Sequence, residues 1–153
     1  MSTKVDAVCL YLTAMWQAAM STTLTGVQVV DGPQADSDPS NEWLFVAYDG
    51  DRPDEGNEAA TAEQDLMTFA RGKQEAGSIS CAATARRGDT DLPAARSRAF
   101  AVLSAAEDLL RADMQLGGLV MHAYVSDHQY IPFQSTSGCK ARVVFTVTYL
   151  TQL

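Results

Sequence analysis

The chain has 153 residues, of which 46% are hydrophobic and 20% are charged, a size and composition that fit one soluble domain with its own hydrophobic core. Nineteen acidic residues against eleven basic ones give a net charge of −8. This charge argues against a general affinity for the phosphate backbone of nucleic acids, because that affinity comes from lysine and arginine displacing counterions. It does not exclude DNA passing nearby.

The cysteines and the N-terminal segment bear on the compartment. Cys9, Cys81 and Cys139 lie far apart and form no Cys-x-x-Cys pair, which predicts free, partly buried thiols in a reducing compartment. The first twenty residues do not resemble a signal peptide, since Asp6 closely follows Lys4. No apolar run approaches the ~20 residues that span a bilayer. We therefore expect a protein that folds in a cytoplasm, with no membrane partner.

The N-terminal third predicts one helix and two strands. A helix is expected over residues 3–20, with Thr3 as its cap, because apolar residues recur at three- and four-residue spacing. Gly26 interrupts this pattern. A short strand is expected over 27–31 and ends at an Asp-Gly-Pro turn, and a polar loop follows over 33–41. The β-prone run 43–48 then predicts a strand buried on both faces.

The next segment differs in character. Residues 49–65 contain seven acidic residues and one basic residue, with small and polar residues between them. This composition predicts a long solvated acidic loop, extending to about residue 74. Alternation of apolar and polar residues then indicates a strand over 75–86, or a longer one that begins near Leu66 and bends at Gly72.

The C-terminal half predicts a second helix and two strands. Thr90 or Asp91 caps a helix over 92–112, with Pro93 in its first turn. A strand is expected over 119–125, a connection with a hairpin-like turn over 126–138, and a last strand over 142–150. The whole predicts a single α+β domain, a mixed or antiparallel sheet with both helices packed on one face. Six side chains should be nearly buried: Leu12, Val102, Leu103, Leu109, Phe145 and Val147.

Residues that could carry chemistry do not form a recognisable pattern. His122 and His128 are six residues apart and belong to no Cys/His cluster with metal-ligand spacing. The chain has no Gly-x-Ser-x-Gly nucleophile turn and no phosphate-binding Gly-x-x-x-x-Gly-Lys loop. Asp36 and Asp38 do not match the spacing of an EF-hand calcium loop. The sequence therefore predicts no catalytic residue, no cofactor and no metal.

Seven stretches, taken in their order and spacing, resemble the tail-terminator proteins of long non-contractile-tailed bacteriophages, in particular those that infect actinobacteria. Together they are spread over most of the chain after residue 25. They are VVDGP at 29–33, WLFVAYDGD at 43–51, RGDTD at 87–91, AARSRAF at 94–100, EDLLRAD at 107–113, LGG at 116–118 and ARVVFTVT at 141–148.

The resemblance implies a structural subunit of a homohexameric ring at the tail–neck junction of the virion, assembled in the host cytoplasm. Such a ring ends the growth of the tail tube and joins the tail to the head–neck connector. Its partners would be other copies of itself, the major tail tube protein and a head-closure protein, with genomic DNA passing through. Two alternatives stay open: another neck, connector or minor tail protein, and a small bacterial hydrolase or ligand-binding domain.

Charge suggests how a ring would be arranged. Six copies of −8 carry −48, which has to lie where it does not oppose contacts between subunits. An acidic channel wall would repel passing DNA, whereas the alternative is an acidic loop that faces outside solvent. The candidate channel-lining residues are Asp49, Asp51, Asp54, Glu55 and Glu58. The candidate residues at subunit contacts are Arg86, Arg87, Arg96, Arg98 and Arg142.

Overall fold

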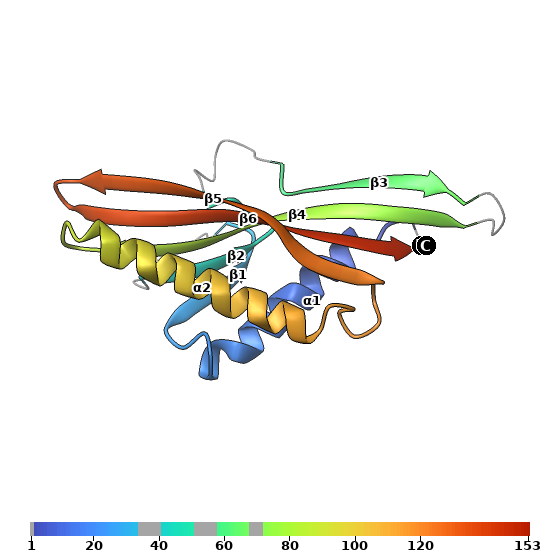
Figure 1. The fold of residues 1–153 in the computed structure, drawn as a ribbon, viewed down its shortest axis with the longest axis horizontal. Coiled ribbons are helices and arrows are strands. Elements are labelled where there is room, and N and C mark those ends of the chain that lie inside the picture. The colour runs from blue at the N-terminus through green and yellow to red at the C-terminus, as the bar shows by residue number, and fades with distance from the viewer. Residues whose placement is uncertain (1, 34–40, 51–57, 68–71) are drawn as a thin grey trace.

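The computed structural model describes residues 2–33, 41–50, 58–67 and 72–153. Its fold is α+β, with a mixed sheet of six strands and both long helices on one face of that sheet (Figure 1). The predicted fold class and the one-sided placement of the helices are therefore confirmed. No helix among the described residues is long and apolar enough to cross a membrane.

The sheet has the order β1-β2-β4-β6-β5, and β3 pairs with the first half of β4. Neighbours β1 and β2 are parallel, and all other pairs are antiparallel. The strands are β1 (Val27–Asp31), β2 (Glu42–Val46), β3 (Ala60–Leu66), β4 (Lys73–Arg87), β5 (His122–Ser135) and β6 (Gly138–Gln152).

The helices begin and end close to the predicted positions. Helix α1 spans Val5–Ala18 and continues as the short 3-10 helix η1 (Ala19–Ser21), while α2 spans Leu92–Ala112. Asp91 caps α2, since its Oδ1 accepts a hydrogen bond from the Ala94 amide at 3.2 Å. Lys4 occupies the cap position of α1, although the Thr3 hydroxyl accepts a hydrogen bond from the Val5 amide.

The core lies between the helices and the sheet. The indole N–H of Trp16 donates to the Ala106 carbonyl at 3.2 Å and so ties α1 to α2, and its ring meets Phe145 edge-on at 6.1 Å. Of the six side chains predicted to be buried, all but Leu109 are in the core. Leu109 is only partly buried, because Leu110 takes the core position and adjacent residues differ by about 100° around a helix.

The loop predicted over about 49–74 is wrong for residues 60–66, which belong to β3, and for residues 73–74, which begin β4. Nearly every residue of β3 is exposed, so its sequence carries no alternation of apolar and polar residues. The strand forms because β4 is long: β6 pairs along one of its edges, and on the other edge β3 pairs with its first half and β2 with its second half. The predicted longer strand with a bend at Gly72 is also wrong, since β3 and β4 are antiparallel.

The predicted connection over 126–138 is wrong as well. Strand β5 begins at His122, after the expected start at 119, and runs to Ser135. Only residues 136–137 form the turn to β6. A bulge between Val125 and Asp127 shifts the register by one residue. Most of the later part of β5 is exposed, so it has no buried side chains that would mark it as a strand.

We call the side of the sheet away from the helices the open face. Alternation along the strands and the register of their pairing place the even-numbered residues of β4 and β6 on this face. Its centre is made of small polar side chains from paired strands: Ser78, Ser80, Thr146 and Thr148. Trp43 and Phe45 of β2 stack at 5.6 Å near one end of the face, with Tyr48 packed against Phe45 at 5.1 Å.

Candidate interaction surface at the two ends of the sheet

Cations gather where β4 ends and β6 begins. Arg86 of β4 is the register partner of Lys140 of β6, and Arg142 follows two residues later on the same face of β6. We call this the basic end, defined by Arg86, Lys140 and Arg142. Like charges directly opposite one another disfavour strand pairing. The β4–β6 pairing nevertheless holds these three cations close together at one end of the sheet.

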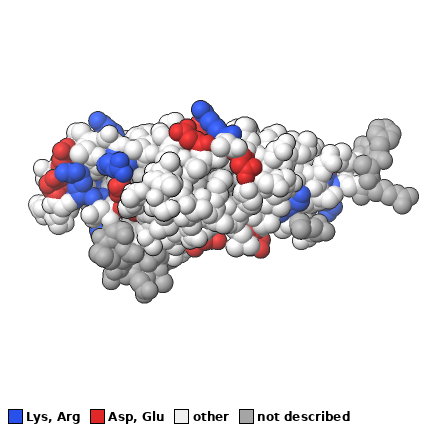
Figure 2. Space-filling view, turned by 90° about the horizontal axis from the view of Figure 1, so that it is seen from below, with Lys and Arg blue, Asp and Glu red and all other residues white. Residues whose placement is uncertain are grey.

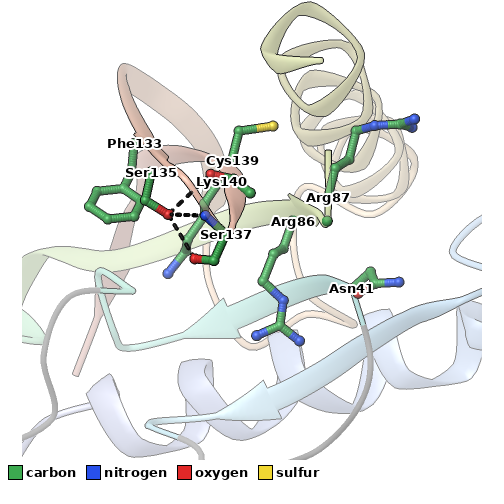
Figure 3. Close-up of a pocket in the computed structure, with 10 residues that line it drawn as sticks. Asn41, Arg86, Arg87, Phe133, Ser135, Ser137, Cys139 and Lys140 are labelled. Atoms are coloured by element: carbon green, nitrogen blue, oxygen red, sulfur yellow. Dashed lines mark hydrogen bonds between the residues drawn. The ribbon is translucent and has the colours of Figure 1, made fainter. Parts of the chain in front are cut away.

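Two adjoining pockets, of about 400 Å³ and 410 Å³, open beside Arg86 and Arg87, and Figure 3 shows the residues that line the first. The first lies against the β5–β6 turn and the second against the start of α2. The first is lined by Asn41, Arg86, Arg87, Gly88, Phe133, Ser135, Ser137, Gly138, Cys139 and Lys140. The second shares Asn41 and residues 86–88 with it and adds Glu42, Ala85, Asp89, Ala95 and Arg98.

The β5–β6 turn gives the first pocket a fixed wall. The Ser135 hydroxyl accepts a hydrogen bond from the Ser137 amide at 3.3 Å and lies 2.9 Å from the Ser137 hydroxyl (Figure 3). Gly138 has a φ of 146°, and a Cβ placed there would lie 2.3 Å from the Arg87 carbonyl oxygen. Only glycine fits this close approach of the turn to β4.

Two of the predicted arginines form ion pairs within the chain. Arg87 donates two hydrogen bonds, of 2.9 and 3.0 Å, to the carboxylate of Asp89. These bonds are the main reason that the pKa of Asp89 is lowered to about 2. Arg98 reaches Glu42 at 2.6 Å. Figure 2, which shows the helix-covered side, has cations and carboxylates intermixed at this end. Such exposed pairs add little stability but fix where the guanidinium groups lie.

The predicted channel-lining residues are divided among three settings. Asp49 is partly buried at the basic end, where its carbonyl oxygen accepts a hydrogen bond from Arg142 Nη1 at 3.1 Å. Glu58 is exposed just before β3. Asp51, Asp54 and Glu55 lie outside the described residues. Whether any of these side chains faces a channel stays a prediction.

The opposite end of the open face is acidic. Glu63 and Asp65 of β3 pair with Ala76 and Gln74 of β4, which places both carboxylates on the open face. Both are exposed, and the neighbouring Leu66 is 76% exposed. We call Glu63 and Asp65 the acidic end; Leu66 pairs with Lys73 and therefore lies on the other face of β3. The β3–β4 hairpin that carries them and the β5–β6 turn lie at opposite ends of an elongated molecule (Figure 1).

Of the five predicted arginines, Arg86, Arg87 and Arg98 line the pockets, Arg142 lies nearby on β6, and Arg96 is exposed on α2 outside the linings. The sequence prediction missed Lys140 and Phe133, which is 62% exposed. Reading 126–138 as a connection hid Phe133. The β-prone residues Tyr130, Ile131 and Phe133 were the available signal for a strand there, although Pro132 between them weakened it.

The described side chains do not converge on a catalytic arrangement. His122 and His128 lie on opposite faces of β5: the first beside Tyr124, the second against Phe100 of α2. Burial raises the pKa of the Cys9 thiol to about 11 and that of Cys81 to about 12, so both stay protonated at neutral pH. No group of three or more His, Cys, Asp or Glu side chains in the described part of the chain could hold a metal ion.

Comparisons of the chain with protein-family models and with curated proteins find no match.

Proposed function

We propose that this protein is a structural subunit of a ring that ends the tail tube of a long-tailed bacteriophage and joins the tail to the head–neck connector. The observation that carries the proposal is the one-sided sheet, which has both helices on one face and strands whose outer edges are unpaired among the described residues. The resemblance of the sequence to tail terminators supplies the biological setting. In this setting the protein acts by assembly and carries out no reaction.

The sheet leaves surfaces that assembly would cover. Both helices pack on one face, and the open face carries half-exposed side chains along β6. Among the described residues, β1, β3 and β5 each pair with only one neighbouring strand. Open edges and uncovered faces of this kind are surfaces through which β-proteins join other chains. They support a role completed by neighbouring subunits.

The centre of the open face suits the wall of a channel for DNA. Ser78, Ser80, Thr146 and Thr148 present hydroxyl groups and no positive charge there. A wall rich in lysine or arginine would retain DNA through counterion release. In this arrangement the open face lines the bore, and the two charged ends of each sheet meet neighbouring subunits. Other copies of the chain, the tube protein, a head-closure protein and passing DNA are the proposed partners.

The direct test is tube capping. The protein is added to polymerising tail-tube protein of the same phage, and tube lengths are measured by electron microscopy. Capping predicts shorter tubes that carry an extra disc of density at one end. If tube lengths do not change and the protein binds isolated head connectors instead, the role is that of another neck protein.

The pocket beside Arg86 keeps the ligand-binding alternative testable. A pocket of about 400 Å³ could hold a small anion-bearing molecule. Thermal-shift measurements with a panel of small carboxylates and phosphates test this reading. A protein that stays monomeric and is stabilised by one of them would favour ligand binding over assembly.

A further inference from the structure

We propose that the N-terminal segment, residues 2–4, is a strap that locks the edge strand β3 onto the sheet through Gln64 and Glu75. Strap and strand dock together and come off together, while α2 and the rest of the sheet stay folded. Because β3 carries Glu63 and Asp65, the lock also decides whether these two carboxylates are held on the open face. The inference concerns the single chain and does not depend on the proposed ring.

Strand β3 has little of its own to hold it in place. It lies at the edge of the sheet and pairs with β4 along one side (Figure 1). Residues 61–66 are all exposed, so the strand buries almost no apolar surface. Its sequence, ATAEQDL, consists mostly of residues that are uncommon in strands. A strand of this kind opens readily unless side chains tie it down.

Gln64 supplies such a tie. It pairs with Glu75 of β4, on the side of the sheet that faces the helices. The side-chain amide of a glutamine has two N–H donors, and both find acceptors here. Nε2 of Gln64 donates to the Ser2 carbonyl at 2.6 Å and to Glu75 Oε2 at 2.7 Å. One side chain therefore holds both the N-terminal segment and a buried carboxylate.

Lys4 fastens the strap to the body of the protein. Its backbone amide donates to Glu75 Oε1 at 3.0 Å. Its ammonium group donates to the Leu119 carbonyl at 2.7 Å and to the Thr151 hydroxyl at 3.1 Å. Leu119 follows α2 and Thr151 belongs to β6, so these bonds reach parts of the molecule that lie beyond β3 and β4.

Glu75 makes the docking of strap and strand cooperative. The Gln64–Ser2 bond joins the two directly, and the carboxylate of Glu75 joins them a second time, by accepting from the Lys4 amide and from Gln64. Glu75 is 0% exposed, and a buried ionised group that loses a donor costs more free energy than an exposed one. If either segment leaves, the other loses a hydrogen bond and Glu75 loses a donor. Both segments are therefore stable together and weak apart.

Amide hydrogen exchange tests this lock, read by mass spectrometry in peptides that cover residues 2–8 and 60–66. Gln64→Ala removes both Nε2 bonds and should speed exchange in both peptides by about tenfold, because hydrogen bonds to ionised groups are among the stronger ones. Lys4→Ala is the reciprocal variant. It should speed exchange in 60–66 as well, although the bonds of its ammonium group go to Leu119 and Thr151 and not to β3.

Glu63→Ala is the matched control, because it truncates the adjacent side chain of β3 on the opposite face. It should leave exchange in 2–8 at the wild-type rate. Peptides from α2 and β6 should also keep their wild-type rates in all three variants, which shows that the body has not unfolded.

Three results would overturn the lock. The first is faster exchange of 60–66 in Gln64→Ala with no change in 2–8, which means that strap and strand are independent. The second is a wild-type rate in 60–66 for Lys4→Ala. The third is equal acceleration of α2 and β6 in both variants, which means that β3 is no separate unit. If only one variant unfolds as a whole, the other decides, because the two act from opposite sides of the lock.

Discussion

Glu75 is a fully buried carboxylate that links distant parts of the chain. It accepts hydrogen bonds from the Tyr149 hydroxyl and the Gln64 amide, both at 2.7 Å, and from the Lys4 backbone amide at 3.0 Å. Burial alone would raise the pKa of Glu75, but these donors outweigh it and hold that pKa below its ordinary value. Burial and the bond to Glu75 raise the pKa of Tyr149. The carboxylate of Glu75 in β4 thus links the N-terminal segment, β3 and β6 through hydrogen bonds.

Glu75 should make stability depend on acid pH. Its pKa is lower in the folded chain than in the unfolded chain, so its contribution is complete above the unfolded value of about 4.3 and is lost as pH falls through the folded value. Urea unfolding from about pH 7 to about pH 3 should show a shallower acid decline for Glu75→Gln than for wild type. Exposed Glu63→Gln is the control and should keep the wild-type slope. Equal slopes for Glu75→Gln and wild type would contradict this role.

Residue 77 has to be glycine because the aromatic ring of Tyr149 lies against its backbone. It pairs with Tyr149 across β4 and β6, and a Cβ at this glycine would lie 2.2 Å from a carbon of the buried tyrosine ring. Gly77→Ala should lower the free energy of unfolding by about 1–3 kcal/mol, because the ring has to shift in a packed core. Gly88→Ala adds the same methyl group where no atom lies within 4 Å and should change stability little. Denaturant titration of the two variants measures both free energies of unfolding, and equal losses in the two would contradict this explanation.

At the scale of elements, strands and helices with a regular pattern of buried side chains were predictable from the sequence. Strands that are mostly exposed were not. Helix α2 carries its own cap at Asp91 and its proline in the first turn, and β6 alternates buried and half-buried residues along nearly its whole length. Local chemistry and burial specify both. Strand β3 and the later part of β5 bury almost nothing, so only the long partners β4 and β6 specify them. A single sequence carries little signal for a strand stabilised mainly by its neighbour's hydrogen bonds.

The packing of α2 on the sheet should dominate stability. Leu103 is 5% exposed between α2 and the sheet. Leu103→Ala should therefore cost about 2–5 kcal/mol, through lost apolar contact and the cavity left behind. Leu10→Ala removes the same atoms from a side chain that is 58% exposed on α1 and should cost far less. Chemical denaturation of both variants measures the difference, and similar losses would contradict the assignment of the core.

At the scale of the whole molecule, the two charged ends arise from strand register. The sequence predicted Arg86, Arg87 and Arg98 at subunit contacts, which stays a prediction, and the structure places these arginines around adjoining pockets. It did not indicate Lys140, because only the β4–β6 register sets that side chain opposite Arg86. Nor did it indicate the acidic end, since residues 60–66 were interpreted as loop. Long-range pairing decides both surfaces, and composition alone does not encode it.

The mass and shape of the purified wild-type protein test the central claim most directly. Light scattering at moderate salt, combined with negative-stain electron microscopy, distinguishes a ring from a single chain. A hexamer predicts a mass of about 98 kDa, six times the 16.4 kDa of one chain, and round particles with a central hole. A mass of 16.4 kDa at every concentration and salt, with no ring-shaped particles, would contradict the claim that this protein works by assembling with itself.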